Sequence, residues 1–266
     1  MNKKIFFADL DGTLLNDQKM ITPLTHQSLK EFLERGNYFS ICTGRPINSA
    51  LAVFESLQLP AEGCYIIAFN GAQIYDCATK QTIHRCEVSE ELIQMIFKLA
   101  ESYGLHCQTY SDTHIISKAD NEAMQFYMRH IHMPLIVTDD ILGALDVLPC
   151  KLMVVELHDH EKLEQFRLDL ESKSKGQLQL MYSNPNYLEI FSTNAGKGIA
   201  VRSLCNHLSV PVENSIGAGD QQNDLSMIEA AGLGVAMCNG SEEVRKAADV
   251  VTTKDNNHDG LVPFLK

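Results

Sequence analysis

Short apolar runs alternate with amphipathic stretches along the first third of the chain. The apolar runs are residues 5–8, 38–42 and 65–69. They have the length of buried strands, and the stretches between them carry apolar residues at helical spacing. Thr22 followed by Pro23 is a typical helix start, and Gly36 is a typical helix end. Strands that alternate with helices favour a parallel sheet covered on both faces.

The same alternation returns in the last third of the chain, after about residue 188. Predicted helices there are residues 197–207 and 223–231, and predicted strands are 215–218, 234–237 and 249–252. The middle has a different rhythm, with helices at 90–103 and 160–173, a weaker helix near 120–130, and strands at 151–157 and 178–182. We therefore predict an α/β protein whose doubly wound, mostly parallel sheet is formed by residues 1–81 and 188–266. Residues 82–187 are predicted to form an inserted α+β domain.

Composition and charge narrow the classes of partner. The 266 residues carry 22 Lys and Arg against 34 Asp and Glu, a formal net charge of −12, which disfavours nucleic acid and anionic membrane surfaces. No apolar run approaches the ~20 residues that span a bilayer, and no secretion signal is evident. The eight cysteines form no CxxC pair, so buried thiols are favoured over zinc or a redox pair. We expect a cytoplasmic protein, and the sequence does not indicate its oligomeric state.

The first predicted strand ends in Asp9-Leu10-Asp11-Gly12-Thr13. Two carboxylates at a spacing of two project to the same side of an extended chain. They lie at the carboxyl end of a parallel strand, where open α/β sheets bind their ligands. A turn with two solvated acids is the alternative interpretation of this segment by itself.

Later strands of the predicted sheet also end in polar groups. They are followed by Thr43-Gly44-Arg45, by Asn70-Gly71 and by Gly219-Asp220 with Asn223-Asp224, while Gly196-Lys197-Gly198 begins a helix. Asp9, Asp11, Asp220 and Asp224 would then meet a single ammonium group, that of Lys197. Their mutual repulsion requires a divalent cation, and ligands that are all oxygen favour Mg²⁺ over zinc.

These segments, in this order, resemble the four motifs of the haloacid dehalogenase superfamily of phosphatases. Thr43-Gly44-Arg45-Pro46 and the long insert are similar to the Cof-type branch, which carries a large α/β cap. The resemblance covers the whole chain and is tightest over the two segments of the predicted sheet. It implies a Rossmann-like catalytic core and an activity on phosphate monoesters.

The resemblance also implies roles for individual residues. Asp9 is expected to attack phosphorus and form an aspartyl-phosphate, and Asp11 is expected to act as the general acid and base. Expected phosphate-binding groups are the side chains of Thr43, Lys197 and Asn223 and the backbone N–H groups of Leu10 and Gly44. Expected Mg²⁺ ligands are Asp9, the backbone carbonyl of Asp11, and Asp220, with Asp224 orienting the metal's waters.

Several alternatives stay open at this level. Lys197 and Asp224 could be ordinary exposed helix residues, and Arg45, which could pair with a surface acid, is left out of the catalytic set. A phosphotransferase or mutase could use the same aspartyl-phosphate, and a non-catalytic sugar-phosphate binding protein is a third possibility. Small phosphorylated metabolites are the expected substrates, with sugar phosphates first and phosphorylated cofactors such as pyridoxal phosphate after them.

Overall fold

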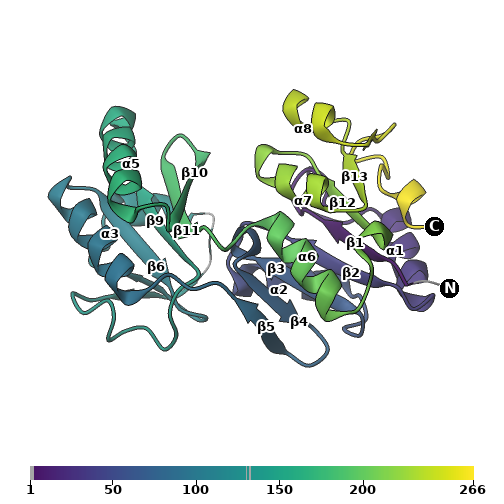
Figure 1. Ribbon diagram of the computed structural model, residues 1–266, viewed down its shortest axis with the longest axis horizontal. Coiled ribbons are helices and arrows are strands. Elements are labelled where there is room, and N and C mark those ends of the chain that lie inside the picture. The colour runs from purple at the N-terminus through teal and green to yellow at the C-terminus, as the bar shows by residue number, and fades with distance from the viewer. Residues whose placement is uncertain (1–2, 130, 132) are drawn as a thin grey trace. The chain divides into compact units, whose positions relative to one another are not determined.

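The computed structural model describes residues 3–129, 131 and 133–266, and the chain divides into two compact units (Figure 1). The first unit is Met1–Arg85 with Ala195–Lys266, and the second is Cys86–Asn194. These boundaries lie a few residues beyond the expected ones at 81/82 and 187/188. The reason is that residues 81–85 pair within the sheet of the first unit, whereas residues 187–192 pair within the sheet of the second.

The first unit is built on an eight-stranded sheet. Across the sheet the strands are β14 (Val250–Val251), β13 (Leu233–Ala236), β12 (Ser215–Gly219), β1 (Ile5–Ala8), β2 (Tyr38–Cys42), β3 (Cys64–Ala68), β4 (Gln73–Asp76) and β5 (Gln81–Arg85). All pairs from β14 to β3 are parallel, and β4 and β5 add an antiparallel hairpin at one edge. This confirms the predicted α/β fold with a mostly parallel sheet.

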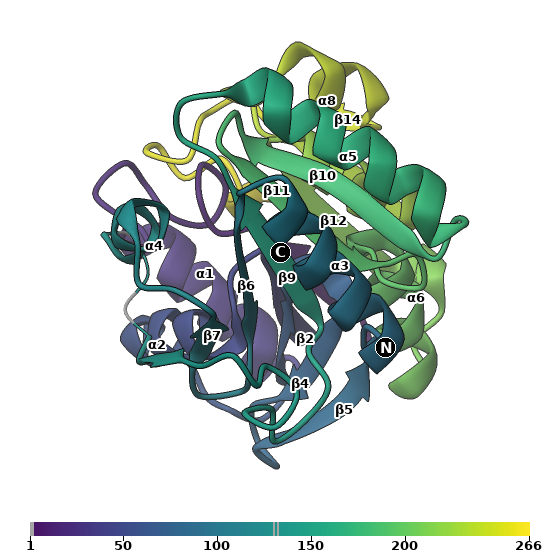
Figure 2. The same cartoon turned by 90° about the vertical axis from the view of Figure 1, so that its left-hand side faces the viewer.

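Helices cover both faces of this sheet. The α-helices are α1 (Pro23–Glu34), α2 (Ile47–Leu57), α6 (Lys197–His207), α7 (Leu225–Ala230) and α8 (Glu242–Ala247). Short 3-10 helices are η1 (Phe69–Gly71), η2 (Val212–Asn214), η3 (Gln222–Asp224) and η4 (Val262–Phe264). Figure 2 shows α1 and α2 on one side of the sheet and α6 on the other.

Alternation along β1 explains why both faces are covered. Phe6 points to one face, where its ring packs edge-on against Phe32 of α1 at a centroid distance of 6.3 Å. Ile5 and Phe7 point to the other face and share a buried cluster with residues of α6 and α7. Because successive side chains of a strand point to opposite faces, a wholly apolar strand must be covered on both.

The second unit has a six-stranded sheet of a different kind. Across the sheet the strands are β10 (Leu178–Asn184), β11 (Tyr187–Ser192), β9 (Lys151–Val155), β6 (His106–Tyr110), β7 (Ile115–Ser117) and β8 (Leu135–Val137). Every pair is antiparallel except β7 with β8. Its helices are α3 (Glu90–Ser102), α4 (Glu122–Met128) and α5 (His160–Ser174). The helix expected near 120–130 corresponds to α4, and residue 130 lies outside the described residues.

Figure 2 shows α3 and α5 on one face of this sheet. The core of the second unit lies between these helices and the sheet. Leu152 and Val154 of β9 point into it, together with Phe97 of α3 and Phe166 of α5. No helix among the described residues is long and apolar enough to cross a lipid bilayer.

Candidate active site

Three carboxylates converge at the carboxyl ends of β1 and β12. These strands are parallel neighbours with Ala8 opposite Ala218, so Asp9 and Asp220 leave the sheet at the same edge. Asp224 follows one turn later, in η3. Each of the three carboxylates offers one oxygen, and these oxygens lie within 4.8 Å of one another. We call Asp9, Asp220 and Asp224 the acidic cluster; all three are buried.

The ammonium group of Lys197 lies beside the acidic cluster. Its Nζ lies 2.6 Å from Oδ1 of Asp9 and 2.6 Å from Oδ1 of Asp224, and its side chain is 0% exposed. Burial acts to lower the pKa of Lys197, but Asp224 and Asp9 outweigh it and hold that pKa above its usual value. The lysine is therefore a buried, charged partner of two carboxylates.

Gly71 lets the start of α6 come close enough to place this lysine. A Cβ on Gly71 would lie 2.2 Å from the carbonyl carbon of Gly196 and 2.7 Å from the backbone nitrogen of Lys197. Gly71 also has a φ of +99°, which side chains rarely adopt. Only glycine satisfies both demands, so Gly71 is a structural support of the site.

Asp224 uses its two oxygens for different tasks. Oδ1 accepts from Lys197, whereas Oδ2 accepts from the backbone N–H groups of Asp220 and Gln221, each at 3.0 Å. Thr13 donates from Oγ1 to Oδ1 of Asp220 at 2.8 Å and fixes that carboxylate. No role is predicted for Thr13 from the sequence, although it belongs to the first motif.

The cluster holds more negative than positive charge. Burial raises the pKa of Asp9 to about 8, with a further contribution from Asp224, while Lys197 acts in the opposite direction. Burial also raises the pKa of Asp220. Three carboxylates against one ammonium group form a site that suits a cation with oxygen ligands.

The carboxylate of Asp11 lies outside the acidic cluster. Its Oδ2 is 2.7 Å from Nη2 of Arg45, and its Oδ1 is 2.8 Å from Nζ of Lys19. Burial acts to raise the pKa of Asp11, but hydrogen bonds from Lys19 and Arg45 outweigh it and hold that pKa below its usual value. Neither Arg45 nor Lys19 is among the catalytic residues expected from the sequence.

The expected phosphate-binding residues lie along the same sheet edge. Thr43 is buried at the end of β2, and its Oγ1 accepts from the backbone N–H of Arg45 at 3.2 Å. Asn223 in η3 donates to Oδ1 of Asn70 at 3.4 Å. A Cβ on Gly44 would lie 2.9 Å from Oδ1 of Asn70, so Gly44 and Asn70 are also neighbours.

Leu10, whose backbone N–H was expected to bind phosphate, is buried directly after Asp9. Its carbonyl accepts from the backbone N–H of Leu15 at 2.8 Å, which closes the loop that carries Asp11. The first motif is therefore a compact loop at the end of β1.

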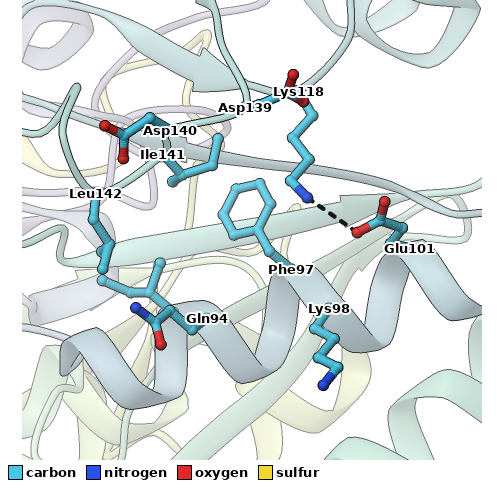
Figure 3. A pocket seen from close by; sticks show the side chains of 10 residues that line it. Gln94, Phe97, Lys98, Glu101, Lys118, Asp139, Asp140, Ile141 and Leu142 are labelled. Carbon is cyan, nitrogen blue, oxygen red and sulfur yellow. Dashed lines mark hydrogen bonds and ion pairs between the residues drawn. The ribbon is translucent and has the colours of Figure 1, made fainter.

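A separate cavity of about 440 Å³ lies in the second unit, beside α3 (Figure 3). Phe97 and Ile141 line its apolar part, and an ion pair of 3.0 Å between Lys118 and Glu101 borders it. Its lining residues include no cysteine, serine, threonine or histidine. Unlike the edge of the first sheet, this cavity holds none of the clustered carboxylates of the described residues that could bind a metal ion together.

Comparison with known proteins shows the family. Residues 6–265 match the haloacid dehalogenase-like hydrolases. The chain belongs to this family. Its match spans both units, so the second unit is part of the family architecture rather than an unrelated addition.

Individual relatives of this hydrolase agree with that result. It is 31% identical to the putative phosphatase YxeH of Bacillus subtilis, over 96% of this chain and 94% of the relative. It is 29% identical to the Bacillus subtilis 5-amino-6-(5-phospho-D-ribitylamino)uracil phosphatase YwtE, over 98% of this chain and 96% of the relative. A crystal structure from Thermotoga maritima superposes with a TM-score of 0.86 at 32% identity, over 99% of this chain and 96% of that one. The chain is an enzyme of the phosphatase type.

Proposed function

We propose that this hydrolase cleaves phosphate monoesters with Mg²⁺, through an aspartyl-phosphate on Asp9. The observation that carries the proposal is the buried carboxylate of Asp9 at the carboxyl end of a parallel strand. Its Oδ1 lies 2.6 Å from Nζ of Lys197. One Asp9 oxygen attacks phosphorus while the bond to the leaving oxygen breaks. Water then attacks phosphorus and releases the Asp9 carboxylate and inorganic phosphate.

The acidic cluster fits a magnesium ion. Its donors are all oxygens, and they lie within 4.8 Å of one another. Asp9, Asp220 and the backbone carbonyl of Asp11 are the proposed ligands. Asp224 is 0% exposed and accepts from Lys197 and from the backbone N–H groups of Asp220 and Gln221, which supports a role behind the ligands. When bound, the ion neutralises charge on the phosphoryl group.

Lys197 opposes the negative charge around Asp9. As the phosphoryl group is transferred, its oxygens gain charge, and the buried ammonium group stabilises that charge in a site of low dielectric. Thr43, Asn223 and the backbone N–H groups of Leu10 and Gly44 are the proposed donors to the same oxygens.

Asp11 is the proposed acid and base. In the first step the protonated form of Asp11 gives its proton to the leaving alkoxide, and in the second step the carboxylate so formed takes a proton from the attacking water. Its position two residues after Asp9 supports this role, because the loop after β1 carries both residues.

The proposed substrates are small phosphorylated metabolites, with sugar phosphates first. Three Bacillus subtilis relatives named as phosphatases of a phosphoribityl compound, 27–29% identical to this chain, support a phosphate ester of a polyol. We propose the second unit as the cap domain of the enzyme. The cytoplasm is the proposed location, which the eight free cysteines support, because disulfides are rare there.

Phosphate release tests this proposal directly. A panel of sugar phosphates, polyol phosphates and phosphorylated cofactors is incubated with the enzyme in Mg²⁺ and, separately, in a chelator. The Asp9→Asn protein is the blank. We expect Mg²⁺-dependent release that the blank lacks. Release by Asp9→Asn at the wild-type rate would overturn the role of Asp9, and release unaffected by the chelator would overturn the metal.

A further inference from the structure

Two cations hold the carboxylate of Asp11 at both of its oxygens. Nη2 of Arg45 lies 2.9 Å from Oδ1 and 2.7 Å from Oδ2, and Nε of Arg45 lies 3.2 Å from Oδ2. Nζ of Lys19 lies 2.8 Å from Oδ1. We call Asp11, Arg45 and Lys19 the Asp11 clamp. In this arrangement both carboxylate oxygens are occupied by protein donors.

The backbone places Arg45 beside the proposed phosphoryl site. Its N–H donates to Oγ1 of Thr43, and its carbonyl accepts from the N–H of Phe69 at 3.0 Å. Arg45 therefore follows the strand end that carries Thr43, while its guanidinium group, 29% exposed as a side chain, reaches across to Asp11. The guanidinium group is therefore partly exposed to solvent rather than enclosed by the protein.

Lys19 lies in a tight turn that the side chain of Asn16 closes. Its φ of 59° is left-handed, a backbone conformation that a lysine rarely adopts. The side chain of Asn16 closes the turn by accepting from the N–H groups of Gln18 and Met20, each at 3.0 Å. The turn keeps the lysine next to Asp11.

A phosphoryl group competes with Asp11 for the guanidinium group. Arg binds carboxylate and phosphate through the same planar, two-bond geometry, and a phosphoryl group carries more charge than a carboxylate. While Arg45 and Lys19 occupy both oxygens of Asp11, neither oxygen is available to a leaving group. Binding of the phosphoryl group and release of Asp11 therefore both depend on the side chain of Arg45.

We propose that Arg45 serves two anions in turn. It holds Asp11 in the free enzyme and moves to the phosphoryl group when substrate binds, which releases the Asp11 side chain to face the leaving oxygen. Only hydrogen bonds and ion pairs change in this exchange. Lys19 stays with Asp11 throughout. The inference rests on the proposed function, because it requires a phosphoryl group beside Thr43.

A double-mutant cycle on binding of inorganic phosphate tests the exchange without relying on turnover. Phosphate affinity is measured by titration calorimetry in excess Mg²⁺ for the wild type, Asp11→Asn, Arg45→Met and the double variant. In the wild-type background Asp11→Asn frees Arg45, and we expect phosphate binding to tighten by about fivefold, the range of a partly exposed ion pair. In the Arg45→Met background the tightening should be less than about twofold.

The control variant is Lys19→Gln. It also removes one positive charge beside Asp11 but leaves Arg45 in place, so Asp11→Asn should still tighten phosphate binding in that background. Arg45→Lys, which keeps the charge but not the two-bond geometry, should give an intermediate result. This variant replaces Arg45→Met in the cycle if the methionine variant does not fold.

An equal effect of Asp11→Asn in both Arg45 backgrounds would overturn the inference, because the lost charge alone would then explain it. Loss of the tightening in Lys19→Gln would overturn it as well. If the wild type turns substrate over and the cycle shows no coupling, only this inference fails. If the wild type neither binds phosphate nor releases it from any substrate, the proposed function fails too.

Discussion

Replacing Lys197 with methionine removes the cation between two buried carboxylates. The Lys197 side chain is 0% exposed, and it lies 2.6 Å from both Asp9 and Asp224. Breaking a buried ion pair by removing one partner costs about 3–5 kcal/mol, because the remaining charge is left buried. Burial already raises the pKa of Asp9, so this carboxyl group can take up a proton and limit the loss to the lower end of that range.

We therefore expect Lys197→Met to lower the free energy of unfolding by about 3 kcal/mol and the melting temperature by on the order of 10 °C. Phosphate release should be lost as well. The measurement is urea unfolding of wild type and variant, followed by circular dichroism, with a calorimetric melting curve in parallel.

The matched control is Lys246→Met. Lys246 and Glu242 form an ion pair of similar length, 2.7 Å, but their side chains are 73% and 75% exposed. Exposed helix pairs contribute about 0.3–0.5 kcal/mol. The two substitutions differ in burial, so equal losses of stability in Lys197→Met and Lys246→Met would refute the reasoning.

Three further predictions concern the metal, the acid and the loop geometry. Mg²⁺ at a hundredfold excess over its Kd should stabilise the folded enzyme by about 2.7 kcal/mol, which is measured as a rise in the melting temperature. A rise that persists in Asp220→Asn would contradict the proposed ligands. Asp11→Asn should slow hydrolysis of alkyl phosphates more than that of p-nitrophenyl phosphate, whose leaving group needs little protonation; equal losses would argue against the acid role. Gly71→Ala should lower the free energy of unfolding in urea by more than about 2 kcal/mol, because the new Cβ would meet the carbonyl group of Gly196. Gly36 also has a positive φ, +80°, but has open space around it, so Gly36→Ala should cost about 1 kcal/mol. Equal costs would contradict the close approach at Gly71.

The predictable part of the fold is the part whose strands are buried on both faces. Residues 5–8 and 65–68 are uninterrupted apolar runs, and such runs mark a covered parallel strand without further information. The hairpin strand β5 was not predicted, because Gln81–Arg85 is a mostly polar strand at the edge of the sheet. Its pairing with β4 is also what moved the unit boundary to residue 85.

Strands of the second unit were missed for a different reason. All five residues of β6 (His106–Tyr110) are buried, yet the strand contains Gln108 and Thr109. Gln108 donates to the hydroxyl of Tyr110 at 2.8 Å, so one face of this strand is satisfied by hydrogen bonds and not by apolar packing. A search for apolar runs does not detect such a strand, because its polar residues are buried with their partners.

The candidate site also has a part that could be predicted from the sequence and a part that could not. The order of the motifs and the carboxyl ends of parallel strands are enough to predict that Asp9, Lys197 and Asp220 belong together. The pairing of Asp11 with Arg45 depends on side-chain rotamers across 34 positions of sequence, which no local pattern encodes. The contact of Lys19 with Asp11 was not predicted, because Lys19 itself has a left-handed backbone conformation, which sequence patterns associate with glycine.

Trapping the covalent intermediate tests the central claim most directly. The enzyme is mixed with a substrate from the panel that carries a labelled phosphoryl group, quenched in acid within the first turnover, digested and sequenced by mass spectrometry. The account predicts a phosphoryl group on the peptide that contains Asp9, and none in the Asp9→Asn protein. Rapid hydrolysis by the wild type with no labelled peptide, or label on a residue other than Asp9, would contradict it.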